Sequence, residues 1–340
     1  MAGTSVSATN IEKPVGRAEV QRILMILLLS VGSVMVSYTT RRLLPRLALE
    51  HEKSLCILSK RLKILAMFFI EPFSMFSSIW SFSFDEMSVA SFPLIGILLM
   101  LLVASSILFI TKILRFEPNQ AASMFTSGAF SNILTFGGLT AFLLFGIEGY
   151  TLIILLNLFI VPVTYFVGYP VSRQIGLGQP LKEGFSRQAL ANAPFLVIPF
   201  VAFIAGGICN FVKIDQPQLM ISLRSILIPS NTVLLGISIG LTLRFEAIGR
   251  YWKEIGWIFF VKFIISPTIM MIISLLFGLR HVMGGLPFKV AIIASVMPVG
   301  FNALIPPALY GFDLDLANSA WIASMFAFIM ILPAAYLILM

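Results

Sequence analysis

The chain repeats apolar stretches of about 20 residues, and this repetition constrains its fold more than any other feature. A helix of that length spans the hydrocarbon core of a bilayer, whereas helices of soluble proteins average about 12 residues. The composition agrees, because 59% of the 340 residues are hydrophobic and only 11% are charged. Soluble domains carry about 25% charged residues. The sequence therefore predicts an all-α polytopic integral membrane protein, which we expect in the cell (plasma) membrane.

Ten such stretches predict ten transmembrane helices in two groups of five. They are residues 23–39, 64–82, 92–113, 121–145 and 150–171 in the first group, and 193–212, 219–243, 255–279, 290–310 and 316–340 in the second. The predicted domains are a polar N-terminal tail (1–22), a first five-helix repeat (23–171), a cytoplasmic loop (172–192) and a second repeat (193–340). The longest connection, 172–192, is too short for a folded domain. Any activity is therefore expected in or across the bilayer.

The distribution of lysine and arginine predicts the orientation of these helices. Fifteen of them lie in loops that follow odd-numbered helices, and six lie on the other side. Because cytoplasmic loops are enriched in Lys and Arg, the odd loops should be cytoplasmic and both termini extracytoplasmic. An odd number of helices per half then requires the second half to be inverted.

Corresponding positions of the two halves support an inverted repeat. Helix-breaking and polar residues recur in the second, fourth and fifth helix of each half. The pairs are Pro72 with Pro229, Asn132 with Asn302, and Pro162 with Pro333. Inverted-repeat transporters bind substrate near the midplane, between discontinuous helices at corresponding positions. We therefore expect helices four and nine to be broken and to cross.

The expected substrate site comprises the residues that would form those breaks. A broken helix exposes backbone groups that lipid cannot satisfy, so it persists only where protein or a wet cavity satisfies them. The amides of Asn132 and Asn302 would bind the substrate. The breaks themselves are assigned to Gly137 with Gly138 in helix four, and to Pro306 with Pro307 in helix nine.

Several of these segments resemble the auxin efflux carrier family of permeases. The matches to the family's helix-four pattern are Asn132, Gly137, Phe145, Gly146, Glu148 and Gly149. The matches to its helix-nine pattern are Met297, Pro298, Asn302, Tyr310 and Gly311. Its helix-seven and helix-two segments are similar to "IPSNTVLLGISIGLTL", which includes Pro229 and Gly236, and to "FIEPFSMF".

The resemblance covers nearly the whole chain and implies a fold in which broken helices four and nine cross while one bundle moves against the other. The sequence departs from the family pattern at two places in helix four. Leu139 stands where the family has proline, and Leu134 stands where it has a small residue. Gly137 and Gly138 would then have to break the helix without the proline.

Ionisable residues within the predicted helices are few, and burying them is costly unless they are paired or hydrated. Glu71, directly before Pro72, is the candidate proton carrier or cation ligand; the alternative is a neutral side chain that hydrogen-bonds backbone freed by the proline. Lys262 and Arg224 lie near helix ends, where their side chains can snorkel to the interface, and either could steer an anion. Ser131, Ser230 and Asn231 are further candidates.

These observations predict a secondary active transporter that moves a small organic anion, such as a carboxylate, by alternating access. The expected partners are that anion, the bilayer, a proton or sodium as coupling ion, and a second copy in a homodimer. Neither nucleic acid, cofactor nor metal is expected. The alternatives are a sodium-coupled bile-acid-type symporter and a membrane receptor or channel. An intramembrane prenyltransferase would rest on Asp313 and Asp315 without a second acidic cluster, so no enzyme is expected.

Overall fold

The computed structural model describes residues 16–43, 52–82, 87–178, 193–241 and 248–339. Within these ranges every regular element is helical. Seven helical segments there are long and apolar enough to cross a membrane, and two shorter apolar helices span Val197–Phe211 and Met283–Ser295. The expectation of an all-α membrane protein is thereby confirmed.

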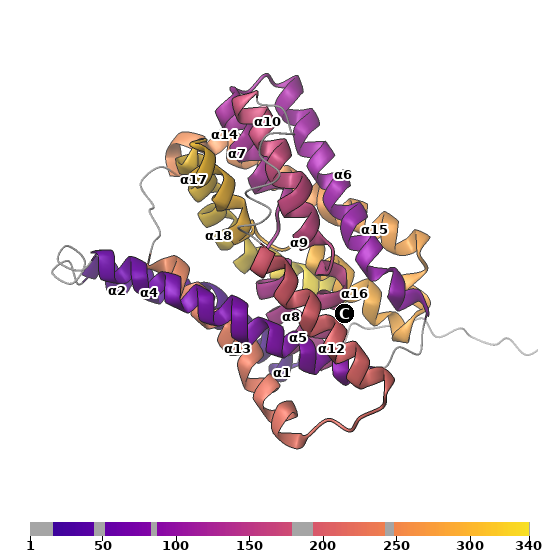
Figure 1. Cartoon of the computed structure of the whole chain (residues 1–340). Coiled ribbons are helices and arrows are strands. Elements are labelled where there is room, and N and C mark those ends of the chain that lie inside the picture. Colours follow the sequence, from indigo (N-terminus) through magenta and orange to yellow (C-terminus); the bar gives the residue numbers. More distant parts are fainter. Residues whose placement is uncertain (1–15, 44–51, 83–86, 179–192, 242–247, 340) are drawn as a thin grey trace, which may run out of the picture.

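The helices form two bundles (Figure 1). The first, here called the scaffold bundle, occupies the lower part of the view, where α12 packs along α5 and α13 packs against α2, α4 and α5. Its helices are α1 (Arg17–Leu27), α2 (Ser33–Leu43), α4 (Glu52–Leu65), α5 (Glu71–Trp80), α12 (Ala193–Phe211) and α13 (Gln218–Gly240). Short π-helical turns join α1 to α2 and α4 to α5, so each pair forms one long helix.

The second, here called the crossing bundle, extends above the scaffold bundle in Figure 1. In it α7 packs between α6, α10 and α18, and α16 packs on α8 and α15. Its helices are α6 (Phe92–Ile113), α7 (Pro118–Ala129), α8 (Gly138–Asn157), α9 (Ile160–Val163), α10 (Tyr169–Leu177), α14 (Trp252–Phe260), α15 (Ser266–Leu276), α16 (Leu286–Ser295), α17 (Ile305–Tyr310) and α18 (Leu314–Leu339).

Glycines set the close packing of the scaffold bundle. Gly236 and Gly240 lie four residues apart on α13, where a small-xxx-small pattern predicts a close helix approach. A Cβ atom added at either glycine would overlap the hydroxyl of Ser33 or Ser37, respectively. These two serines lie on α2, so the backbone of α13 at the two glycines is in direct contact with serine side chains of α2.

The segment from α8 to α10 turns back on itself at Gly146. This residue has φ 71° and ψ −156°, a conformation outside the helical region that only glycine adopts readily. A Cβ atom on Gly137 would lie 3.7 Å from Ile153 Cδ1, although a continuous helix would separate the two residues by about 24 Å. Residues on either side of Gly146 therefore pack as two antiparallel helices.

Two helices begin earlier than their apolar stretches predict. α4 begins at Glu52 rather than near residue 64, and α1 begins at Arg17 rather than at residue 23. In α1 the Glu19 carboxylate accepts the Gly16 N–H at 2.9 Å, which stabilises the helix start. Charged residues that were assigned to a loop and to a polar tail are thus part of helices. Hydropathy detects only the apolar part of a helix, so the charged turns before that part were not recognised as helical.

Candidate functional site

Two helices of the crossing bundle are interrupted, and their interruptions pair with each other. Residues 130–132 and 298–300 run antiparallel and are here called the crossing. Two main-chain hydrogen bonds join them: the Asn132 N–H donates to the Pro298 carbonyl at 2.9 Å, and the Gly300 N–H donates to the Phe130 carbonyl at 2.8 Å. Backbone groups that neither helix can satisfy are thereby satisfied by the other one.

Side chains from three other helices fix the crossing in place. The Tyr169 hydroxyl of α10 donates to the Asn302 carbonyl at 3.0 Å. The Val299 N–H donates to the Ser324 hydroxyl of α18 at 3.0 Å. The third side chain is Lys262, from the π-helical turn between α14 and α15. All three belong to the crossing bundle, so the interrupted segments are held rigidly within it.

Lys262 is fully buried, and the expectation that it snorkels to the interface was wrong. Its ammonium donates to the Phe130 carbonyl at 2.9 Å and to the Ser131 hydroxyl at 2.6 Å. The carbonyls at the C-terminal end of α7 carry partial negative charge, and no N–H group of the helix donates to them. They therefore offer the ammonium a better environment than a long reach to the membrane surface.

The breaks do not lie at the residues to which they were assigned. In helix four the break spans residues 130–132 and includes Asn132, whereas in helix nine it ends before Phe301, so Asn302 lies in the first turn after it. Gly137 and Gly138 continue the helix, and their missing side chains make room for Met297 and Tyr150, respectively. Pro306 and Pro307 are buried in the first turn of α17, where a missing N–H is tolerated. These four residues thus shape the packing of the second half-helices and do not interrupt them.

A cavity of about 480 Å³ separates the two bundles beside the crossing. Residues between 60 and 75, together with Pro199 and Leu235, line it from the scaffold bundle. Residues 131–136, several between 157 and 165, and several between 300 and 305 line it from the crossing bundle. Its size lies within the range of about 300–1,000 Å³ that holds small-molecule ligands.

Three amide side chains reach the wall of this cavity, namely Asn132, Asn302 and Asn157. Within the described parts of the chain, the Asn132 and Asn302 side chains have no hydrogen-bond partner, although Asn132 is only 8% exposed. Each amide offers both donors and an acceptor. The prediction that Asn132 and Asn302 lie together at a crossing of helices four and nine agrees with this geometry.

Two lysines of α4 form one end of the cavity. Lys60 is exposed, and Lys63 is partly buried with its ammonium 4.1 Å from the centre of the Phe301 ring. Phe301 directly follows the crossing, so this cation–π contact joins the two bundles across the cavity. Lys60 and Lys63 give that end of the cavity positive charge.

Glu71 lies on the same helix, farther from the lysine end, and also lines the cavity. It begins α5, and its carboxyl is a hydrogen-bond partner of the Asn231 side chain on α13. Asn231 is buried, with its side-chain oxygen unpaired in the described structure. The neighbouring Thr232 hydroxyl donates to the Thr135 carbonyl at 3.2 Å, which adds a second contact between the bundles.

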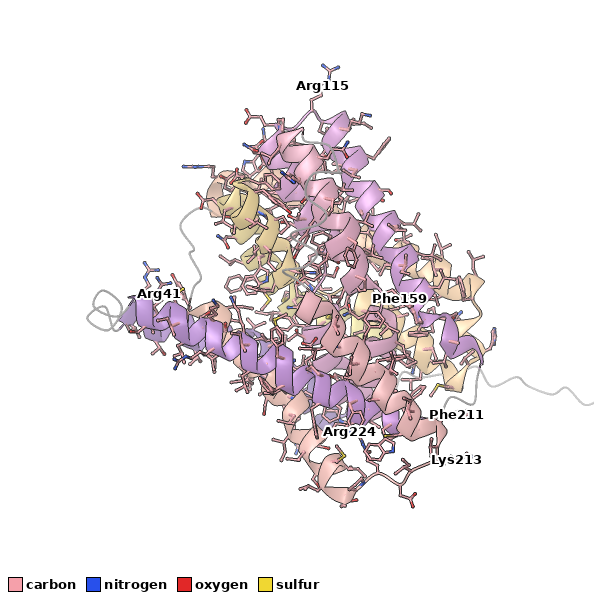
Figure 2. All side chains as sticks on the ribbon, in the orientation of Figure 1. Arg41, Arg115, Phe159, Phe211, Lys213 and Arg224 are labelled. Carbon is pink, nitrogen blue, oxygen red and sulfur yellow. The ribbon has the colours of Figure 1, made fainter. Side chains whose placement is uncertain are left out.

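Of the expected site residues, Glu71, Ser131, Asn132 and Asn302 line the cavity, whereas Gly137, Gly138, Pro306, Pro307, Ser230, Asn231, Arg224 and Lys262 do not. Ser230 donates to the Ile226 carbonyl of its own helix at 2.8 Å. Arg224 is buried and lies at the lower end of the molecule in Figure 2. It donates to the Ser77 carbonyl at 2.9 Å and to the Ser81 hydroxyl at 2.7 Å. Arg224 therefore stabilises the end of α5 and does not snorkel.

Six polar residues that line the cavity were not predicted from the sequence: Lys60, Lys63, Thr135, Asn157, Thr164 and Tyr165. Lys60 and Lys63 were assigned to a loop because their charge lies outside the apolar stretch, although α4 carries them into the bundle interface. Asn157 was expected to tolerate replacement by Ala with a much smaller effect on binding than Asn132 or Asn302, but it lines the same cavity. A helical wheel continued from Glu71 back to Lys60 places Lys60, Lys63 and Met67 on one face, because they are three and four residues apart. That spacing was the available signal.

No family model matches the chain, and no curated protein matches it significantly.

Proposed function

We propose that the protein is a secondary active transporter that carries a small organic anion, such as a carboxylate, by alternating access. The observation that carries this proposal is the cavity between two bundles with the crossing in its wall. Discontinuous helices next to a ligand-sized space are the arrangement in which inverted-repeat transporters bind their substrates. Alternating access would require one bundle to move against the other around a ligand bound in this cavity.

The charge and the hydrogen-bond donors of the cavity favour an anion. Lys60 and Lys63 supply positive charge at one end, and the amides of Asn132 and Asn302 supply donors at the crossing. The half-helices that follow the breaks begin on the cavity wall at Ile133 and Phe301. Helix N-termini carry partial positive charge, which also favours an anion.

The proposed architecture consists of ten transmembrane helices in two inverted five-helix repeats, as in the auxin efflux carrier family. Four features support it: the Gly146 turn, the paired interruptions, the two bundles, and helices at each of the ten apolar stretches. The positive charge of the odd loops predicts that both termini lie outside the cell. With that orientation, the end of the cavity that Lys60 lines would face the cytoplasm.

Transport against a gradient needs an energy source, and the chain has no nucleotide-binding motif. The energy would come from an ion gradient, from the membrane potential or from the gradient of the substrate itself. Glu71 is the acidic residue on the described cavity wall, and it is the proposed proton carrier.

Counterflow in proteoliposomes tests the proposal. Purified protein is reconstituted with an unlabelled carboxylate inside, and uptake of the same labelled carboxylate is followed for a panel of carboxylates with one to three carboxyl groups. A carrier should show saturable uptake that the internal substrate accelerates. Flux that does not saturate would indicate a channel. Binding without flux would indicate a receptor, and no response to any anion would contradict the proposed substrate class.

A further inference from the structure

Lys262 is a buried, positively charged residue that has no role in the transport cycle proposed above. Its side chain is fully buried, and it lies behind Ser131, which lines the cavity. No carboxylate of the described residues pairs with it; its partners are the Phe130 carbonyl and the Ser131 hydroxyl. A lone buried cation costs several kcal/mol in a membrane, so its position calls for a specific benefit.

Those two partners are the kinds of oxygen that transporters use to hold a coupling cation. In inverted-repeat transporters, unwound carbonyls and the C-terminal ends of half-helices coordinate sodium near the substrate. Phe130 directly follows the C-terminal end of α7, and its carbonyl already accepts the Gly300 N–H from the other interrupted helix. The same carbonyl also accepts from the Lys262 ammonium, which is possible because each carbonyl oxygen has two lone pairs.

We propose that the Lys262 ammonium is a tethered cation that occupies a cation site at the crossing, so that the carrier works without sodium. This inference deepens the proposed function and rests on it. A side chain cannot be exchanged with either solution, so this site cannot transmit a sodium gradient. Coupling to protons, where it occurs, remains assigned to Glu71 on the opposite wall of the cavity.

The proposal predicts that shortening Lys262 exposes a latent sodium site. Lys262→Ala removes the ammonium and leaves room beside the Phe130 carbonyl and the Ser131 hydroxyl for a sodium ion with water. Lys262→Met is the matched control, because it removes the charge and still fills most of the space. Lys262→Ala combined with Ser131→Ala removes one of the two oxygen ligands.

The experiment measures melting temperature in detergent, in sodium chloride, potassium chloride and choline chloride at equal ionic strength. The wild-type protein should melt at the same temperature in all three salts. Lys262→Ala, purified in sodium chloride, should melt several degrees higher in sodium than in choline, with a saturable dependence on sodium concentration. Lys262→Met should show no sodium response, and Ser131→Ala should reduce the response of Lys262→Ala.

Specific stabilisation of the wild-type protein by sodium would overturn the proposal. So would a Lys262→Ala protein that does not respond to sodium, or that cannot be purified even in its presence. Counterflow forms a separate arm: the wild type should transport equally in sodium and in choline, and Lys262→Ala only in sodium. Absence of counterflow with every carboxylate would contradict the proposed function, whereas the melting temperatures would still decide whether the cation site exists.

Discussion

Arg224 in the scaffold bundle and Lys262 in the crossing bundle each place a buried cation at the C-terminal end of a helix. Arg224 binds the last turn of α5, and Lys262 binds the residues that follow α7. Both satisfy carbonyls that a helix leaves free. Their surroundings differ, because Arg224 lies at the end of its bundle, whereas Lys262 contacts Ser131 on the cavity wall. The same local interaction thus serves stability in one bundle and the site in the other.

The largest effect is expected at the cavity end of α5, the helix whose other end Arg224 stabilises. Glu71 begins α5 at the cavity, and Glu71→Gln should abolish uptake driven by a pH gradient while leaving substrate exchange largely intact. Exchange needs no net proton movement, so only a proton carrier separates the two activities. Both are measured in the same proteoliposomes, with the exposed Glu117→Gln as control. An equal loss of exchange and driven uptake would show that Glu71 is structural.

The opposite end of α5 should affect stability alone. Arg224→Met removes charged hydrogen bonds to Ser77 and Ser81, which should lower the free energy of unfolding by about 3 kcal/mol. Counterflow per folded molecule should stay close to that of the wild type. Thermal unfolding in detergent measures the loss of stability. Arg115→Met, at the opposite end of the molecule in Figure 2, is the matched control and should change little. If folded Arg224→Met protein lost counterflow, Arg224 would also act in transport, and the proposed difference between Arg224 and Lys262 would be wrong.

Replacing Asn132 or Asn302 should have the opposite result: substrate binding should weaken, and the protein should remain folded. Asn132→Ala or Asn302→Ala should weaken binding by about 1.5 to 3 kcal/mol, roughly 10- to 150-fold, because each removes a hydrogen bond to a charged ligand. Calorimetry on the purified, monodisperse variants measures the affinity. Asn210→Ala is the control, since Asn210 donates to carbonyls at the end of α5 and lies outside the cavity. Affinities within about twofold of the wild type for both crossing variants would place the substrate elsewhere.

The smallest expected effect concerns the lysine end of the cavity. Lys63→Gln should lower affinity about fivefold, equivalent to roughly 1 kcal/mol, because its partly hydrated charge is screened by water and salt. The loss should shrink as the salt concentration rises. Lys253→Gln is a close control, since Lys253 lies over the Trp252 ring at 5.4 Å on the exposed surface. A loss that does not change with salt would indicate a packing role for Lys63.

Hydropathy predicted the membrane class and the approximate positions of most helices, because lipid selects long apolar segments regardless of their neighbours. The presence of Asn132 and Asn302 beside helix-breaking residues also pointed to the crossing. The exact breaks could not be predicted, because the chain leaves the helix at Phe130, where the Gly300 N–H donates to the Phe130 carbonyl from a distant part of the sequence. The same limit applies to Lys262, whose orientation depends on a carbonyl 132 residues away along the chain. Lys60 and Lys63 could have been found from their helical spacing.

The pairing across the crossing also sets an order for biogenesis. The Phe130 carbonyl and the Asn132 N–H find their main-chain partners only in residues 298–300, which the ribosome makes much later. Until the second half has entered the bilayer, the first half holds unpaired polar backbone in a solvent that cannot hydrate it. The first half should therefore remain dependent on the insertion machinery or a chaperone, and its release into lipid should follow synthesis of the second half.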